Sequence, residues 1–416
     1  MIRTQLKWVA IGQAANLLLP VLLFPLLAQR LGVQGFAVFA VLTGLSQYST
    51  LVVELGLNHV GLARMNNAAT QAGKVQTFSS VQAVKLLLAL GVLLVLAGVV
   101  AWRSPVPGVG AGTVVVLCAG SILTCLVYPA WFFTLIQRQD INVRISTLSR
   151  LGLVVGVLLG VHSEADVVVA VALFNFAFVP LALLHVRHWV GYLRLAGAFD
   201  AVRLRATLHA GISMSGAMVR ETVTSLGIAP IYGFFAGAHD VGVFAFAEKL
   251  AKIILLPAPI VASIALVHRE RLLAAPVVRR LWCGDVMCWG GLLAAAALAV
   301  ALYGGAAVAV VEHGFPAYRA AVPMIEVLVL FFPLVYGNYL LVAVLHTGRE
   351  NFSLVGRLSY GYVLLLAGLS AALGGLWGGM GLAVALGVAE LLLFAALLGT
   401  GGGASSSPRA DEKVSE

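Results

Sequence analysis

Charged residues are scarce in this chain of 416 residues: Asp, Glu, Lys and Arg make up 10% of it, whereas hydrophobic residues make up 61%. A soluble domain carries roughly a quarter charged residues, so this chain has too few polar side chains to cover its own surface in water. The composition excludes an ordinary soluble enzyme and predicts a protein whose solvent is lipid. At about 20 residues per crossing, the length suits about twelve transmembrane helices and leaves no room for a separate soluble domain.

Cysteine is rare as well, with four residues, Cys118, Cys125, Cys283 and Cys288, in or beside apolar segments. Cys118 and Cys125 are two turns apart on one predicted helix, too far for a disulfide. No zinc-type spacing is present, so we expect no metal site and interpret the cysteines as small apolar residues. The glycine cluster at 374–381 is not followed by Lys-Ser or Lys-Thr, which excludes a nucleotide loop and indicates a turn between packed helices. We expect no cofactor.

Long apolar runs are abundant, and each is near the length that crosses about 30 Å of hydrocarbon as a helix. They lie at about 8–29, 36–57, 78–102, 112–136, 146–162, 167–186, 210–236, 243–267, 284–311, 320–345, 352–373 and 376–399. Because lipid offers no hydrogen bonds to an open sheet edge, the predicted fold class is an all-α polytopic membrane protein. The first run lacks a small-residue cleavage site, so we expect it to stay as a helix. Prolines inside the runs predict kinks: Pro20, Pro25, Pro129, Pro180, Pro230, Pro257, Pro259 and Pro333.

The basic residues behind the net charge of +9 gather in alternate loops. One set of loops and the two termini hold Arg3, Lys7, Arg64, Lys74, Arg138, Arg144, Arg187, Arg194, Arg203, Arg205, Arg269, Arg271, Arg279, Arg280, Arg349, Arg409 and Lys413. The opposite set holds Arg30, Arg103 and Arg319. The positive-inside rule then places both termini in the cytoplasm. We interpret this charge as a determinant of topology beside membrane lipids, and we expect no nucleic-acid partner.

A short internal repeat divides the chain. GFAVFAV at 35–41 and GVFAFAE at 242–248 each follow a proline-containing run and a short predicted external turn. The offset is half the chain, which predicts two six-helix bundles around a central cavity, the geometry of alternating access. The expected bundles are residues 1–190 and 210–400, joined by a basic cytoplasmic linker at 191–209 and followed by a disordered tail at 401–416.

Charges inside the apolar runs are the informative residues, because a charge at the bilayer centre costs about 2.5–3.5 kcal/mol even on the lenient insertion scale. Glu54 and Lys85 are near predicted cytoplasmic ends, which favours a structural role. Glu248 and Lys252 are four residues apart in the order that suits a helix ion pair, so a structural and a functional role are equally favoured. Arg220 and Glu390 are each about 15 Å from a helix end, which favours a functional role.

Several segments, in order along nearly the whole chain, carry a family resemblance. They are GQAANLLLPVLLFPLLAQRLGVQGFAVFAV, the QY at 47–48, VELGLNHVGLARMN at 53–66, YPAWFFTLIQRQ at 128–139, GVFAFAEKLAKII at 242–254, YRAAVPMIEVL at 318–328 and ALGVAELLL around Glu390. The chain resembles the Wzx-type O-antigen and polysaccharide flippases of the multidrug/oligosaccharidyl-lipid/polysaccharide exporter superfamily. It departs from the expected pattern at VHRERLLAAP, where a proline-led basic stretch would follow the eighth span.

This resemblance implies a flippase in the bacterial inner membrane that moves a polyprenyl-pyrophosphate-linked oligosaccharide repeat unit for O-antigen or exopolysaccharide assembly. Such a protein would work beside a glycan polymerase and chain-length machinery and would be driven by a proton or sodium ion. The candidate cations for the pyrophosphate are Arg220, Lys249 and Lys252, and the candidate coupling carboxylates are Glu221, Glu326 and Glu390.

Other functions remain open. A cation-coupled exporter of a drug or metabolite belongs to the same superfamily, but basic cavity residues disfavour cationic drugs. A membrane-embedded glycan polymerase, ligase or glycosyltransferase is disfavoured by short predicted external loops and by the lack of catalytic residues.

Overall fold

A computed structural model describes residues 2–102, 106, 108–194, 199–255, 286–342 and 352–402 of the chain. For residues 2–20, 286–295 and a few others, among them Glu221, the backbone alone is described. The described residues form helices and the turns between them, without a strand, which confirms the predicted all-α fold class.

The helices of the first half are α1 (Ile2–Glu54), α2 (Leu57–Asn67), α3 (Gln71–Trp102), α4 (Ala111–Val127), α5 (Ala130–Leu135), α6 (Gln139–Gly160), η1 (Glu164–Asp166), α7 (Val167–Phe176), α8 (Val179–Leu184), η2 (Val186–His188) and η3 (Val190–Tyr192). Those of the second half are α9 (Ala201–Leu226), α10 (Ala229–Tyr232), α11 (Ala238–Lys252), η4 (Ile253–Leu255), α15 (Val286–Gly314), η5 (Pro316–Ala321), α16 (Val322–Leu330), α17 (Phe332–Leu341) and α18 (Phe352–Gly402).

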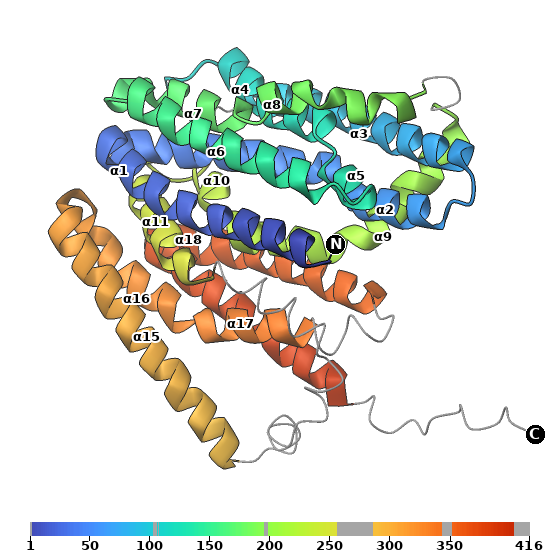
Figure 1. Ribbon diagram of the computed structural model, residues 1–416. Coiled ribbons are helices and arrows are strands. Elements are labelled where there is room, and N and C mark those ends of the chain that lie inside the picture. Colours follow the sequence, from blue (N-terminus) through green and yellow to red (C-terminus); the bar gives the residue numbers. More distant parts are fainter. Residues whose placement is uncertain are drawn as a thin grey trace, which may run out of the picture.

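Each of the twelve predicted runs falls on helix over the part that the structure describes. Two pairs of runs form single long elements that bend at glycine: α1 bends at Gly32 (φ 64°) and α18 at Gly378 (φ 58°), a backbone conformation that glycine adopts without strain. In Figure 1 the helices run between a left end, where α1 bends, and a right end, where α2 and the beginning of α9 lie. We call these the Gly32 end and the α2 end.

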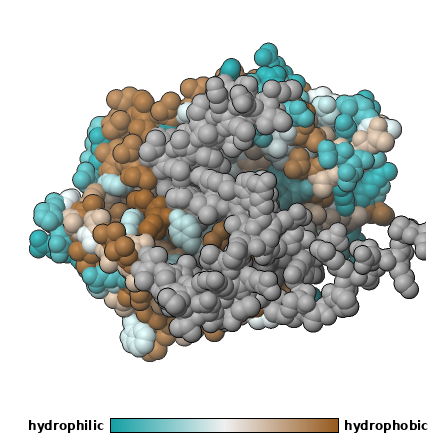
Figure 2. Space-filling model, turned by 60° about the horizontal axis from the view of Figure 1, so that its bottom comes forward, coloured by the Kyte–Doolittle hydropathy of each residue, from teal (hydrophilic) through white to brown (hydrophobic). Residues whose placement is uncertain are grey.

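Within the described residues, eight helical stretches are long and apolar enough to cross a membrane, and two of them, Val21–Asn67 and Leu354–Gly399, have about twice the length that one crossing needs. Large hydrophobic side chains are exposed on several of these helices, for example Leu94 on α3, Leu302 on α15 and Leu364 on α18. On the face shown in Figure 2, outside the grey residues, hydrophilic residues gather most at the right and the far left. The exposed apolar side chains therefore suit contact with lipid.

Four of the prolines lie where helices are interrupted, as predicted, whereas Pro20 and Pro25 lie inside α1, whose non-helical backbone is at Gly32. Helix α4 ends just before Pro129, α7 gives way to α8 at Pro180, α9 to α10 at Pro230, and α16 to α17 at Pro333. A proline lacks the N–H that would continue the helical hydrogen bonding, so each break leaves backbone groups free for other partners. Pro257 and Pro259 lie outside the described residues.

One predicted boundary is wrong. The sequence predicts the fifth run at 146–162, but α6 begins at Gln139, because its first two turns are polar and the hydropathy pattern does not show them. The segment predicted as a linker, 191–209, contains the first turns of α9, which is helical from Ala201, with Asp200 as its N-cap, accepting from the Val202 N–H at 3.0 Å. The expected disordered tail lies almost wholly outside the described residues.

Arg30 and Glu164 cap helices at the Gly32 end. Arg30 Nη1 donates to the carbonyls of Val157, Leu158 and Val161 at 3.0, 2.9 and 2.6 Å, where α6 ends. A cation suits the negative end of a helix dipole. The Gly35 N–H, just after the bend of α1, donates to Glu164 Oε1 at 3.2 Å. Arg30 therefore has a structural partner, the end of α6, which explains its position in the set of loops that holds few basic residues.

The repeated segments pack against each other. Gly242 of α11 lies so close to α1 that a Cβ there would be 2.1 Å from the carbonyl oxygen of Val33. The rings of Phe36 and Phe246 meet edge to face, with centroids 6.2 Å apart. The two segments that are similar in sequence are thus the ones through which α1 and α11 meet.

Candidate functional site: buried polar groups along helix α9

Helix α9 ends in the interior, and its end creates a polar centre. Gly227 has a φ of 89°, which stops the helix, and Pro230 at the beginning of α10 cannot donate a backbone hydrogen bond. The backbone groups of Gly227 and Ile228 at this break need partners from outside the helix, because they are buried.

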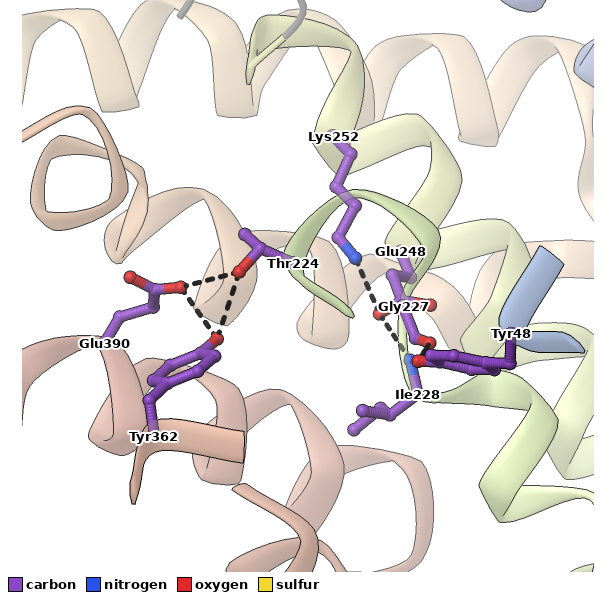
Figure 3. A network of polar contacts seen from close by, with 8 residues as sticks. All are labelled: Tyr48, Thr224, Gly227, Ile228, Glu248, Lys252, Tyr362 and Glu390. Atoms are coloured by element: carbon purple, nitrogen blue, oxygen red, sulfur yellow. Dashed lines mark hydrogen bonds and ion pairs between the residues drawn. The ribbon is translucent and has the colours of Figure 1, made fainter. Parts of the chain in front are cut away.

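Side chains from two other helices supply these partners. The Tyr48 hydroxyl of α1 donates to the Gly227 carbonyl at 2.6 Å, and the Ile228 N–H donates to Glu248 Oε1 of α11 at 3.3 Å (Figure 3). Gly227 leaves no room for a side chain, since a Cβ would be 1.9 Å from Glu248 Oε2. The break is therefore fixed from α1 on one side and from α11 on the other.

Glu248 also binds Lys252. The Lys252 Nζ lies 3.0 Å from Glu248 Oε1, and the two side chains are 9% and 0% exposed. The pair has the i,i+4 spacing seen in the sequence. Glu248 Oε2 has no hydrogen-bond partner among the described residues. Lys252 is thus paired with an acid of its own helix.

A second buried carboxylate, Glu390 of α18, is surrounded by neutral donors. Its Oε1 accepts from the Tyr362 hydroxyl at 2.8 Å and from the Thr224 hydroxyl at 3.4 Å. Its Oε2 accepts from the Asn338 Nδ2 of α17 at 2.6 Å. Glu390 is fully buried, and no Lys, Arg or His of the described residues forms an ion pair with it. A buried carboxylate held only by neutral groups is suited to binding a proton or a small cation.

Arg220 lies one helical turn before Thr224 on the same face of α9. It is 5% exposed, and its guanidinium lies 5.1 Å from the centroid of the Tyr339 ring of α17, a cation–π contact. Its side chain forms no ion pair or hydrogen bond with another of the described residues. Arg220 is therefore a buried cation whose charge is not matched by a carboxylate among the described side chains.

The other predicted site residues are dispersed. Lys249 Nζ lies 5.4 Å from the Phe24 ring centroid, on a different face of α11 from Glu248. Glu326 is exposed on α16. The side chain of Glu221 is not among the described ones. Helix α9 approaches Glu390 through Thr224 and Glu248 through Gly227 (Figure 3). Arg220 lies on the same helix, within about two turns of Gly227.

Lys85 forms a separate buried cluster near the α2 end. It is fully buried, and its Nζ lies 2.7 Å from Asn58 Oδ1 and 4.0 Å from Glu54 Oε1. Asn58 Nδ2 donates to Glu54 Oε1 at 2.8 Å. The cluster lies beside the α1–α2 break, where Leu55 (φ 31°) and Gly56 (φ 71°) interrupt the helix. These contacts favour the structural role inferred for Glu54 and Lys85.

Sequence reasoning missed Arg150 and the neutral partners of Glu390. Because α6 begins at Gln139, Arg150 lies about 16 Å along it rather than near its beginning. Its Nη1 is buried without a hydrogen-bond partner among the described residues. A fifth run extended back to Gln139 would have placed Arg150 near the middle of its helix. Tyr362 and Asn338 carry no charge, and no pattern in the sequence distinguishes them from other polar residues in apolar runs.

Among the residues that the structure describes, no group of three or more His, Cys, Asp or Glu could hold a metal ion. Cys118 and Cys125 are free, buried and both on α4, as predicted.

Comparison with known proteins decides the family. A family model described as "Polysaccharide biosynthesis protein" matches residues 4–267, more than half of the chain. The chain belongs to this family. A relative from Escherichia coli (strain K12), described as "Putative O-antigen transporter", is 27% identical over 256 residues, and the match covers 60% of each chain. The chain therefore spans less than two thirds of that curated relative. These matches confirm the resemblance found in the sequence.

Solved structures show that the family member shares its fold with transporters. The lipid II flippase MurJ in an inward closed conformation matches with a TM-score of 0.68 at 13% identity, covering 95% of this chain and 87% of that one. An inward-facing multidrug resistance MATE transporter of the MOP superfamily matches with a TM-score of 0.62 at 14% identity, covering 96% and 97%. The named relatives are transporters or flippases, in agreement with the prediction that the chain is not an enzyme.

Proposed function

We propose that the protein is a flippase that moves polyprenyl-pyrophosphate-linked oligosaccharide repeat units across the bacterial inner membrane. The observation that carries this proposal is Arg220, a 5% exposed cation inside a membrane protein of the polysaccharide biosynthesis family, which forms no ion pair with another of the described side chains. An unpaired buried charge is costly, so a site that keeps one suits a ligand of opposite charge. The planar guanidinium group can donate two parallel hydrogen bonds to the oxygens of a phosphate group.

The coupling ion is proposed to bind at Glu390. Thr224 is one turn from Arg220 and hydrogen bonds to Glu390, so the substrate site and the carboxylate share α9. Two predicted bundles, residues 1–190 and 210–400, would then rock about a central cavity in alternating access. Glu221, Glu326, Lys249 and Lys252 remain predictions; the ion pair of Lys252 with Glu248 favours a structural role for Lys252.

Two alternatives are weaker. A drug or metabolite exporter of the same fold would need a cavity suited to its cargo, and a buried arginine disfavours cationic drugs. A glycan polymerase or ligase would need catalytic groups on external loops. The buried polar groups described above lie instead between packed helices around α9.

Deletion of the gene is the test of the proposed function. We expect the deletion strain to lose surface glycan and to accumulate lipid-linked repeat units in the cytoplasmic leaflet, because assembly outside requires the flipped substrate. Mass spectrometry of extracted lipids, with leaflet-selective enzymatic release of the glycan, measures both. A deletion strain that lacks the lipid-linked intermediate altogether would instead identify a synthetic enzyme.

Orientation follows from the charge distribution. We expect reporter fusions after Asp166 and Asp240, at the Gly32 end, to report the external side and fusions after Gly73 and Tyr192 to report the cytoplasm. Alkaline phosphatase and fluorescent-protein fusions measure this. Two or more fusions with the reverse pattern would overturn the cytoplasmic placement of both termini.

A further inference from the structure

Four aromatic rings close the Gly32 end between the two halves of the chain. Phe36 comes from α1, Phe246 from α11, and Phe315 and Tyr318 from the segment around η5; all four are 8% exposed or less. We call this group the aromatic seal. Phe246 stacks on Tyr318 with centroids 4.1 Å apart, and Phe36 meets both of these rings edge to face at 6.2 and 6.3 Å. Phe36 is thus the ring of the first half that packs against two rings of the second.

At the aromatic seal, the hydroxyl of Tyr318 links the second half of the chain to α1. The Tyr318 hydroxyl lies 3.0 Å from the Gly32 carbonyl and 3.3 Å from the Ala28 carbonyl, and it can donate to one of them at a time. Both carbonyls belong to the bend of α1, where Gly32 leaves the helical conformation. The bond therefore joins the second half to the point at which α1 is already interrupted.

The polar centre lies directly behind the seal. Phe246 is two residues from Glu248 on α11, and Glu248 is fully buried. On α1, Phe36 is three turns from Tyr48, which holds the break of α9. A hydrated anion at Arg220 cannot pass close-packed rings with so little exposure. A route that leads from Arg220 between these rings would require Phe36 to part from Phe246 and Tyr318.

We propose that the aromatic seal is the exit gate of the transporter, and that Tyr318 is the gating residue that keeps it shut in the conformation seen here. This inference rests on the proposed function, because it assigns the external exit to the Gly32 end. Aromatic faces suit a gate, since they exclude water when packed and have no ionic partner to lose when they part. The hydroxyl of Tyr318 then sets how often the gate opens.

The rate of thiol labelling tests the gate without any glycan. Phe36→Cys is placed in a chain from which the four native cysteines have been replaced, and intact cells are treated with a membrane-impermeant maleimide. We expect slow labelling, and a rate up to about tenfold higher when Tyr318→Phe is added, because loss of one neutral hydrogen bond changes an equilibrium by about that factor at most. The matched control is Tyr303→Phe, whose hydroxyl donates to Leu250 within the second half at 2.6 Å and which should leave the rate unchanged.

Cross-linking tests whether the gate must open for export. A short bifunctional thiol reagent applied to Phe36→Cys/Phe246→Cys should stop export, because it ties the halves together. The control pair, Phe36→Cys/Phe39→Cys, has rings at a similar separation, 6.0 Å, but lies on one helix and should export after cross-linking.

Undiminished export by the cross-linked Phe36→Cys/Phe246→Cys protein would overturn the proposal. A labelling rate of Phe36→Cys that is the same with Tyr318→Phe as with Tyr303→Phe would also overturn it. This outcome can be read even if the double-cysteine variant fails to export before cross-linking. Labelling does not depend on the cargo, so a failure of the flippase assignment appears separately, as a deletion strain that keeps its surface glycan or lacks the lipid-linked intermediate.

Discussion

Arg220→Ala is expected to abolish glycan export while protein level and membrane insertion stay at wild-type values. Arg220 is buried and has a ring, not a carboxylate, against its guanidinium, so its removal deprives an anionic substrate of its partner without leaving an acid unpaired. Loss of a hydrogen-bonded charge in a binding site typically costs about 2–5 kcal/mol, which is 30-fold or more in affinity. Export is measured as surface glycan in the deletion strain carrying each variant.

Arg220→Lys separates charge from geometry. A lysine keeps the charge but presents a point rather than a planar fork, so we expect partial export. Arg319→Ala is the matched control, because Arg319 is an exposed arginine of η5 and its loss should leave export unchanged. Normal export by Arg220→Ala would return Arg220 to a structural role.

Glu248→Ala is expected to reduce the amount of folded protein more than any other single change at the site. It leaves Lys252 buried without its acid and removes the acceptor of the Ile228 N–H at the break of α9. Removing one partner of a buried ion pair costs about 3–5 kcal/mol. Lys252→Met should be destabilising for the corresponding reason, since it leaves Glu248 charged and unpaired.

The double variant Glu248→Gln/Lys252→Met should recover most of the stability, because neither charge is then left alone. Thermal unfolding in detergent measures Glu248→Gln, Lys252→Met, the double variant and the wild type as a double-mutant cycle. If Lys252 instead serves the substrate, Lys252→Met would keep wild-type stability and lose export. That result would contradict the structural role given to the pair here.

The sequence predicted the helices well because membrane spans depend on local properties. Length, hydropathy and proline position are all read from neighbouring residues, and the breaks near Pro129, Pro180, Pro230 and Pro333 follow from the missing N–H of proline. The beginning of α6 was missed because its first turns are polar, and Arg150 was overlooked with it. A hydropathy reading fails where a helix extends beyond its apolar part.

The site was predicted only in part, because its contacts join distant segments. The i,i+4 spacing indicated the pair of Glu248 and Lys252, but no local pattern could choose between that pair and a role in substrate binding. Tyr48 meets Gly227, and Asn338 meets Glu390, across long separations in the chain. Neutral side chains at such distances have no signature in a single sequence. Charge at membrane depth was a useful signal for Arg220 and Glu390, since burying a charged side chain in a membrane is energetically costly.

Flipping by the purified protein tests the central claim most directly. Proteoliposomes containing a lipid-linked oligosaccharide are treated with an enzyme that releases glycan from the outer leaflet alone, and the protected fraction is followed with time. The account predicts that wild-type protein exposes the protected glycan, that Arg220→Ala does so at the rate of protein-free liposomes, and that Arg319→Ala matches wild type. Folded wild-type protein that leaves the glycan protected, or Arg220→Ala protein that exposes it as fast as wild type, would contradict the account.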